Sequence, residues 1–482
     1  MVRVRFRRLS GGVIALAFAL LALVSPRPAR AEPGDELTVY VITFGPGDHP
    51  FYKFGHDAIW IHDSSASPRD RMRRDPVYNW GTFAFGDPAL IPKFVTGRFL
   101  YWLSKAPIDW TVKAYQQENR SVVAQELNLT AAQKKMLRDL VEENAKDENK
   151  YYKYDYYRDN CATRVRDMID KAVGGKLHEA SKAPASMTWR QHTLRLTADD
   201  KVLSLALSVV MGSLIDKPLD QWEEMFLPAY VQQGLRRVTV PGPDGKEIPL
   251  VKSEKDLAVA TGRAPLRTEP PSWGLVMFLV GAALGGAVFL SARASAKKAL
   301  GPRIALGALL FVEGFLSILG ALFVIVWFAT DHEVGYHNEN ILQLAPWCVP
   351  LLGFSIGVAR LKPRSIRRAR LVVTAAAAAS LFGLAWKVLP WMRQDNYWFI
   401  AFAAPMWIGS TLGLRKLEAA LAGAPAKKDD AAPEKSAKPG KKKAVKKEEA
   451  ESDDKAPPAA DAESAASDAD ANAPVDTESE KN

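Results

Sequence analysis

The chain has 482 residues, 48% of them hydrophobic and 24% charged, with a formal net charge of +10 at pH 7. This length is enough to bury a hydrophobic core. Much of the positive charge comes from arginines and lysines beside apolar segments, and the sequence contains no nucleic-acid motif. Nucleic acid is therefore not an expected partner.

The first 31 residues have the pattern of an export signal. Four arginines lie among the first eight residues, followed by the apolar stretch Gly11–Val24 and the small-residue pattern Ala29-Arg30-Ala31. This order predicts a signal peptide, cleaved after Ala31, with a retained anchor helix as the alternative. Both interpretations place the next segment outside the cytoplasm.

From residue 32 onward the composition divides the chain into three regions. Residues 32–272 are mixed in composition and predict an exported, periplasmic domain. Residues 273–414 are strongly apolar, with short polar gaps, and predict a transmembrane domain. Residues 415–482 are rich in Ala, Pro, Lys, Glu and Asp and lack aromatics. Such a segment cannot bury enough apolar area to offset chain entropy, so we expect a disordered cytoplasmic tail.

The apolar region contains five segments long enough, or nearly so, to cross about 30 Å of hydrocarbon. They are Trp273–Leu290, Ile304–Ala329, Ile341–Ala359, Leu371–Leu389 and Tyr397–Leu414. Arginines and lysines fill the first and third gaps, which the positive-inside rule places in the cytoplasm. We therefore expect a multi-pass protein of the inner (cytoplasmic) membrane, with the N-terminal domain and the loop 331–347 outside and the tail inside.

The chain has two cysteines, Cys161 and Cys348, and they lie in different settings. Cys348 falls within a predicted membrane span. Cys161 falls in the exported region, where free thiols tend to oxidise and cysteines are usually paired. An unpaired exported thiol is either an accident of composition or a nucleophile.

A helix is predicted to begin at Cys161, capped by Asp159 or Asn160 and stopped by Gly174-Gly175. Cys161 shares one stripe of this helix with Val165, Met168 and Ala172, whereas Arg164, Arg166, Asp167 and Lys171 face away. In the first turn, the helix dipole and unpaired N–H groups favour a thiolate and can receive an oxyanion. The alternative is a small buried core residue.

A thiol nucleophile needs a base, and His56 is the candidate. It lies near the start of the alternating, strand-like run 54–62 and follows Gly55, where another backbone can approach closely. Asn79, in a second strand-like run at 77–83, is a candidate to orient the imidazole.

Further candidates are less specific. His62 shares the face of His56 and either supports it or is a surface residue, and Asn160 and Arg164 flank the thiol. Asp57, His62 and Asp63 also suggest a metal site, but they lie on opposite strand faces and lack further close ligands. We expect no metal and no cofactor.

Several stretches resemble the DUF4105 (Lnb-like) family of lipoprotein N-acyltransferases. They are 54–57, 78–83, 154–167, 212–228 and an outside-loop motif with Asp331-His332, Asn338, Asn340, Leu342 and Pro346. The resemblance extends over most of residues 37–414. It implies an α+β exported catalytic domain with a circularly permuted papain-like (NlpC/P60-type) fold, followed by an all-α five-helix membrane domain.

The resemblance also implies a reaction. Cys161 would attack a lipid ester while His56 takes the thiol proton, and the acyl group would pass from a thioester to an amine. In an Lnb-like reaction the donor is the sn-2 chain of a diacylglyceryl lipoprotein, and the acceptor is the amino group of its cysteine. The expected partner is thus a lipoprotein or phospholipid in the outer leaflet of the inner membrane.

Two alternatives stay open at this point. A cysteine hydrolase of the same fold would resolve the thioester with water, and a non-enzymatic envelope scaffold would keep only the fold. His332 and Asn340 of the outside loop are candidates to hold the domain or the substrate headgroup at the bilayer surface. A solvated turn histidine is the alternative for His332.

Overall fold

The computed structural model describes residues 32–83, 92–93, 96–97, 100–242 and 244–423. The predicted signal peptide and the tail from residue 424 onward lie outside the described residues.

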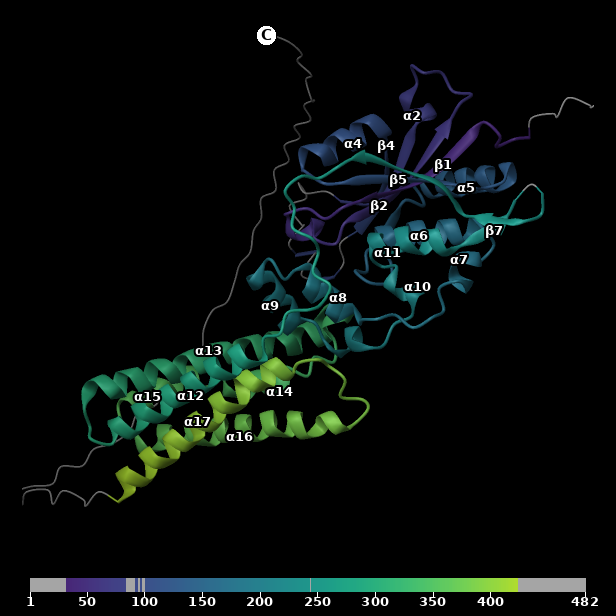
Figure 1. The fold of residues 1–482 in the computed structure, drawn as a ribbon. Coiled ribbons are helices and arrows are strands. Elements are labelled where there is room, and N and C mark those ends of the chain that lie inside the picture. The colour runs from purple at the N-terminus through teal and green to yellow at the C-terminus, as the bar shows by residue number, and fades with distance from the viewer. Residues whose placement is uncertain (1–31, 84–91, 94–95, 98–99, 243, 424–482) are drawn as a thin grey trace, which may run out of the picture. The chain divides into compact units, whose positions relative to one another are not determined.

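The exported domain is α+β, as predicted, and is built on a seven-stranded sheet with the order β6-β4-β3-β2-β1-β5-β9 (Figure 1). Each described pairing is antiparallel. The strands are β1 Leu37–Phe44, β2 His56–Asp63, β3 Pro76–Thr82, β4 Leu100–Pro107, β5 Val122–Leu127, β6 Tyr151–Lys153 and β9 Val251–Ala258. Strands β7 (Thr239–Pro241) and β8 (Glu247–Pro249) form a separate pair.

Helices cover both faces of the sheet. Helix α4 (Ile108–Gln117) packs on one face, where Ile42, Ala58 and Val77 are buried. Helices α5 (Ala131–Asn144), α6 (Cys161–Ala172) and α11 (Pro228–Arg237) pack on the other. Side chains of a strand point alternately to the two faces of the sheet. The β-branched and aromatic residues of one strand therefore pack against helices on both faces.

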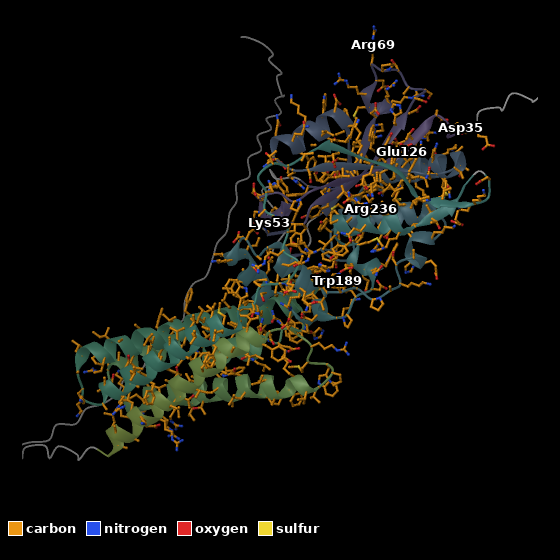
Figure 2. The ribbon with its side chains drawn as sticks, viewed as in Figure 1. Asp35, Lys53, Arg69, Glu126, Trp189 and Arg236 are labelled. Carbon is orange, nitrogen blue, oxygen red and sulfur yellow. The ribbon has the colours of Figure 1, made fainter. Side chains whose placement is uncertain are left out.

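The other elements of this domain are short. They are η1 Pro50–Tyr52, α2 Arg71–Arg74, α7 Lys176–Glu179, α8 Trp189–Leu196, α9 Lys201–Val210, η2 Ser213–Asp216 and α10 Gln221–Glu224. Trp189 of α8, labelled in Figure 2, is 3% exposed and belongs to a cluster that also contains Tyr157 and Phe226. Through Tyr157, this cluster includes the segment that precedes α6.

Four helices of the C-terminal region are long and apolar enough to cross a membrane. They are α12 Gly274–Ser295, α13 Leu300–Ala329, α16 Pro363–Ala385, extended by η5 Trp386–Val388, and α17 Tyr397–Ala422. Helix α17 continues well past Leu414, so the predicted boundary of the tail at 415 was set too early. The arginines 364–370, expected in a loop, lie in the first turns of α16, which Pro363 begins.

The third predicted span, Ile341–Ala359, is not a continuous helix. It consists of α14 (Ile341–Leu344), η4 (Pro346–Cys348) and α15 (Leu351–Ala359), with a bend of 63°. Ala345 has a left-handed backbone (φ 46°), and Pro346 cannot donate a backbone hydrogen bond. The described region therefore has four candidate spans, or five if the bent pair counts as one.

Candidate active site

Helix α6 begins at Cys161 because Asn160 caps it. The Asn160 side chain accepts a 2.9 Å hydrogen bond from the Thr163 N–H, and the Thr163 hydroxyl accepts one of 2.8 Å from the Asn160 N–H. Asn160 also donates to the carbonyls of Tyr156 (2.9 Å) and Phe226 (3.0 Å). This buried amide fixes the turn that presents the thiol.

The inner face of α6 differs from the predicted stripe at several residues. Cys161, Val165 and Ala172 are buried as predicted, but Met168 is only half-buried and Ile169, outside the predicted stripe, is fully buried. Arg166, expected to face away, is also buried, which corrects that expectation. Its guanidinium lies 3.9 Å from the ring centre of Trp222 and donates to the Trp222 carbonyl, so stacking and a hydrogen bond offset its burial.

His56 begins β2 and is held from the neighbouring strand β3. Its Nε2 donates to the Asn79 side-chain oxygen. This bond assigns the hydrogen to Nε2 and leaves Nδ1 to accept a proton. The imidazole lies 5.7 Å from the Phe44 ring and 6.4 Å from the Tyr115 ring, centre to centre. Asn79 therefore has the position expected of an orienting residue.

The thiol and the imidazole converge on Gly81. A Cβ atom added to this glycine would lie 3.8 Å from Cys161 Cβ, from His56 Cε1 and from Tyr154 Cε2. Gly81 has φ +94°, a conformation that favours glycine. Three side chains from α6, β2 and the segment before α6 thus border one small space.

Burial sets the protonation of both groups. It lowers the pKa of His56 to about 4, against an opposing effect of the Asn79 hydrogen bond. Burial raises the pKa of the Cys161 thiol, against opposing hydrogen bonds from the Asp57 and Ala162 N–H groups and the Tyr154 hydroxyl. At neutral pH the resting pair is a neutral thiol and a neutral imidazole, so His56 can act as a general base.

Asp57 adds a buried carboxyl on the opposite side of the strand from His56. One of its oxygens accepts a 2.9 Å hydrogen bond from the Thr43 hydroxyl. The other, Oδ2, is buried without a hydrogen-bond partner among the described residues. Burial raises the pKa of this carboxyl to about 8, so it is mostly protonated at pH 7.

His62 lies at the other end of β2, about 20 Å along the strand from His56. Its Nδ1 is 2.7 Å from an Asp75 oxygen, which also accepts from the Trp60 indole. His62 therefore cannot support His56.

Arg164 braces the turn before the thiol. It pairs with Asp159 through two hydrogen bonds, of 2.5 and 2.7 Å, and its guanidinium lies 4.0 Å from the ring centre of Tyr152.

Tyr154 is the site residue that sequence reasoning missed. Its ring stacks on Tyr101 at 4.3 Å and meets Tyr156 edge-on at 5.9 Å. Its hydroxyl hydrogen-bonds to the thiol. The signal was present as a run of five tyrosines between residues 151 and 157, directly before the cysteine.

A polar cavity of about 330 Å³ is lined in part by Tyr154. Its lining comes from Tyr101, Tyr154 and Tyr156 and from the outside loop between α13 and α14, including His332. Arg158 and Glu333 form a 2.8 Å ion pair beside it. The structure therefore brings His332 to the exported domain, near the site.

Asn340 does not reach this cavity. It is fully buried, and its side chain donates 2.9 Å to the carbonyl of Val209 in α9. This hydrogen bond connects the outside loop to α9, and a role of Asn340 at the bilayer surface stays a prediction.

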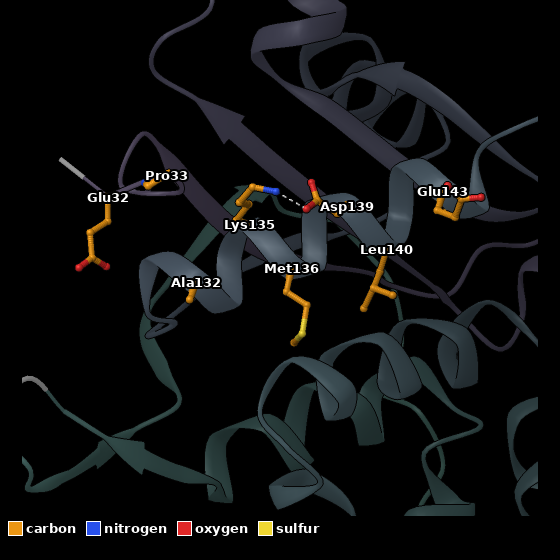
Figure 3. Close-up of a pocket in the computed structure, with 8 residues that line it drawn as sticks. All are labelled: Glu32, Pro33, Ala132, Lys135, Met136, Asp139, Leu140 and Glu143. Atoms are coloured by element: carbon orange, nitrogen blue, oxygen red, sulfur yellow. Dashed lines mark hydrogen bonds and ion pairs between the residues drawn. The ribbon is translucent and has the colours of Figure 1, made fainter.

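A second hollow, of about 560 Å³, runs along α5 (Figure 3). Met136 and Leu140 of α5 line it, together with Glu32 and Pro33. It includes neither the thiol nor the imidazole and contributes nothing to the candidate chemistry.

Comparison with known proteins gives a family match for the exported region. Residues 26–195 match a family described as the Lnb N-terminal periplasmic domain. The matched range contains Cys161, His56, Asn79 and Tyr154. Searches of curated proteins and of solved structures found no match.

Proposed function

We propose, from the match of residues 26–195 to the Lnb N-terminal periplasmic domain, that this chain is an Lnb-like protein and a membrane-tethered thiol acyltransferase. The observation that carries the proposal is the convergence of Cys161, His56 and Tyr154 on Gly81, with His56 oriented by Asn79. Covalent acyl transfer requires a nucleophile next to a base, with a third group that orients the base. The thiol helix packed on antiparallel strands that carry the base supports a circularly permuted papain-like arrangement.

The first half-reaction forms a thioester. The Cys161 proton passes to His56 Nδ1 as the sulfur attacks the carbonyl carbon of a lipid ester. Backbone N–H groups in the first turn of α6 stabilise the resulting oxyanion. The ester C–O bond then breaks, and the departing alkoxide takes the proton back from His56, which leaves an acyl-thioester and a lyso-form alcohol.

The second half-reaction consumes the thioester. An amine attacks the thioester carbonyl, and His56 accepts a proton from the amine nitrogen. The C–S bond breaks, and the sulfur regains its proton from His56. The net change is an ester plus an amine giving an amide plus an alcohol, so no oxidant, metal or cofactor is required.

The surroundings favour a membrane-borne substrate. The apolar helices tether the site to a bilayer and raise the local concentration of any lipid-anchored substrate. The cavity beside Tyr154 is bordered by His332 and by two acidic residues, Asp331 and Glu333, which pair with Lys153 and Arg158. A diacylglyceryl lipoprotein supplies both the ester and the amine. We place the protein in the inner membrane, with its tail in the cytoplasm.

The test uses the full chain in lipid nanodiscs with a synthetic diacylglyceryl lipopeptide. Mass spectrometry should find an N-acylated, lyso-form peptide of unchanged total mass. Free fatty acid with a free amine would identify a hydrolase instead. Full activity of a Cys161→Ser variant would exclude the thiol mechanism, and the absence of any turnover would favour a scaffold.

A further inference from the structure

Helix α9 (Lys201–Val210) has its polarity reversed relative to a helix of a soluble protein. Its serines face inward, with Ser204 0% and Ser208 2% exposed. Some of its apolar residues face outward, with Val202 80% and Val210 46% exposed, whereas its leucines and Val209 are half-buried. An amphipathic helix in water buries its apolar face and exposes its polar one. This pattern indicates that the surroundings of the outer face are not water.

The exposed residues share one side of the helix. Val202, Ala206 and Val210 are spaced at intervals of four and are all exposed. Ser208, on the opposite side, accepts a 3.1 Å hydrogen bond from the indole of Trp398, in the first turn of α17. Ser208 is therefore hydrogen-bonded to protein, and Ser204 is buried although its hydroxyl has no hydrogen-bond partner among the described residues. Val202 and Val210 are left outside.

The C-terminal end of α9 is attached to the outer ends of the membrane helices. The Asn338 side chain donates to the carbonyls of Val209 (2.9 Å) and Val210 (2.8 Å), and Asn340 donates a third bond to Val209. These amides satisfy carbonyls that a helix end leaves without a partner. The attachment fixes α9 against the loop that follows α13.

Packing gives the depth of this attachment. Val209 contacts a cluster formed by Phe323 of α13, Leu344 of α14 and Phe399 of α17. Phe323 lies six residues before the end of α13 at Ala329, which is about 9 Å along the helix axis. The C-terminal end of α9 thus lies beside the apolar surface of the spans rather than above it.

We propose that α9 is an interfacial helix whose outer face, formed by Val202, Ala206 and Val210, lies in the outer leaflet of the bilayer. The exposed apolar face of α9 lies next to the exposed apolar surface of the membrane spans. Phe328, near the end of α13, is 80% exposed on that surface. A helix in this position buries its apolar face at the boundary between headgroups and acyl chains. It holds the exported domain at one height above the lipid, whatever reaction that domain performs.

A depth measurement tests this assignment without relying on any activity. Val202→Cys is labelled with a nitrobenzoxadiazole fluorophore in a Cys161→Ser, Cys348→Ala background and placed in nanodiscs containing doxyl-labelled lipid. The matched control is Met136→Cys on α5, which is 40% exposed in the native protein and lies along the hollow of Figure 3.

We expect lipid quenching at position 202 to exceed that at position 136 at least about threefold, with a blue-shifted emission, because the fluorophore leaves water. Val210→Cys should behave like Val202→Cys. Equal quenching and equal emission at positions 202 and 136 would overturn the proposal and leave the face to water or to a protein partner.

Discussion

The two cysteines of this chain are both buried, yet their surroundings differ. Cys348 is 0% exposed and donates a 3.3 Å hydrogen bond to the Val372 carbonyl between membrane helices. Cys161 is 7% exposed and lies in the first turn of α6, with a neutral imidazole and the Tyr154 hydroxyl beside it. Burial makes a thiol inert unless a base and N–H donors are built around it. The comparison teaches that the neighbours of Cys161, not its burial, make it the candidate nucleophile.

Replacing each cysteine in turn should give the largest difference in activity between the two sites. Cys161→Ser should lower acyl transfer by about 10³-fold or more, because a hydroxyl is far harder to deprotonate than a thiol. Cys348→Ala is the matched control and should retain nearly full activity, since it removes a small packing group far from the base. Turnover of both variants would be compared on the same lipopeptide, and equal losses would contradict the assignment.

The base should account for the next largest effect. His56→Ala should lower kcat by about 10²- to 10⁴-fold, whereas His62→Ala, at the other end of β2, should change it little. Because burial lowers the pKa of His56 to about 4, the base stays neutral as the pH falls until about 4. The rate should therefore decline only as the pH drops through that value. A rate already halved at pH 6 would be at odds with a buried neutral imidazole.

Asn79 should matter less, because it acts through His56. Asn79→Ala removes one hydrogen bond, worth about 1–1.5 kcal/mol, and should lower kcat about tenfold. Asn79→Asp keeps the accepting oxygen and adds a negative charge, which favours the protonated imidazole. The acid limb of its pH–rate profile should then move to higher pH. An unmoved profile would show that Asn79 has only a structural role.

The smallest effect concerns stability. Asn160→Ala removes the cap of α6 and should lower the free energy of unfolding by about 1–2 kcal/mol. Thr130→Ala removes the exposed cap of α5 and is the control. It should lower the free energy of unfolding by less, because Asn160 also donates buried hydrogen bonds to the carbonyls of Tyr156 and Phe226. Denaturant titration in detergent would compare the two. A greater loss for Thr130→Ala would contradict the role given to Asn160.

Much of the site could be predicted because it rests on local periodicity. The alternation around His56 predicts a strand, and the helical spacing after Cys161 predicts a helix. Each pattern also indicates which face of its element is buried. The sequence also supplied two candidate caps, Asp159 and Asn160, of which the structure uses Asn160. The α+β class was implied by the Lnb-like resemblance, which agrees with the match over residues 26–195.

The rest depends on contacts between distant segments. Nothing near Arg166 in the sequence shows that Trp222 will stack on it, so a charged residue was expected to face water. Tyr154 reaches the thiol only because β6 pairs with β4 and turns the chain back. The third span looked continuous by composition, but Ala345 and Pro346 divide it. Such features follow from packing and backbone geometry rather than from periodicity.

Trapping of the acyl-enzyme tests the central claim most directly. The wild-type protein would be mixed with diacylglyceryl lipopeptide, quenched in acid within one turnover, digested and analysed by mass spectrometry. We predict one acyl chain on the peptide that contains Cys161, removable by hydroxylamine and absent from the Cys161→Ala variant. N-acylated product formed without any acyl adduct on Cys161, or with an adduct on another residue, would contradict the proposed mechanism.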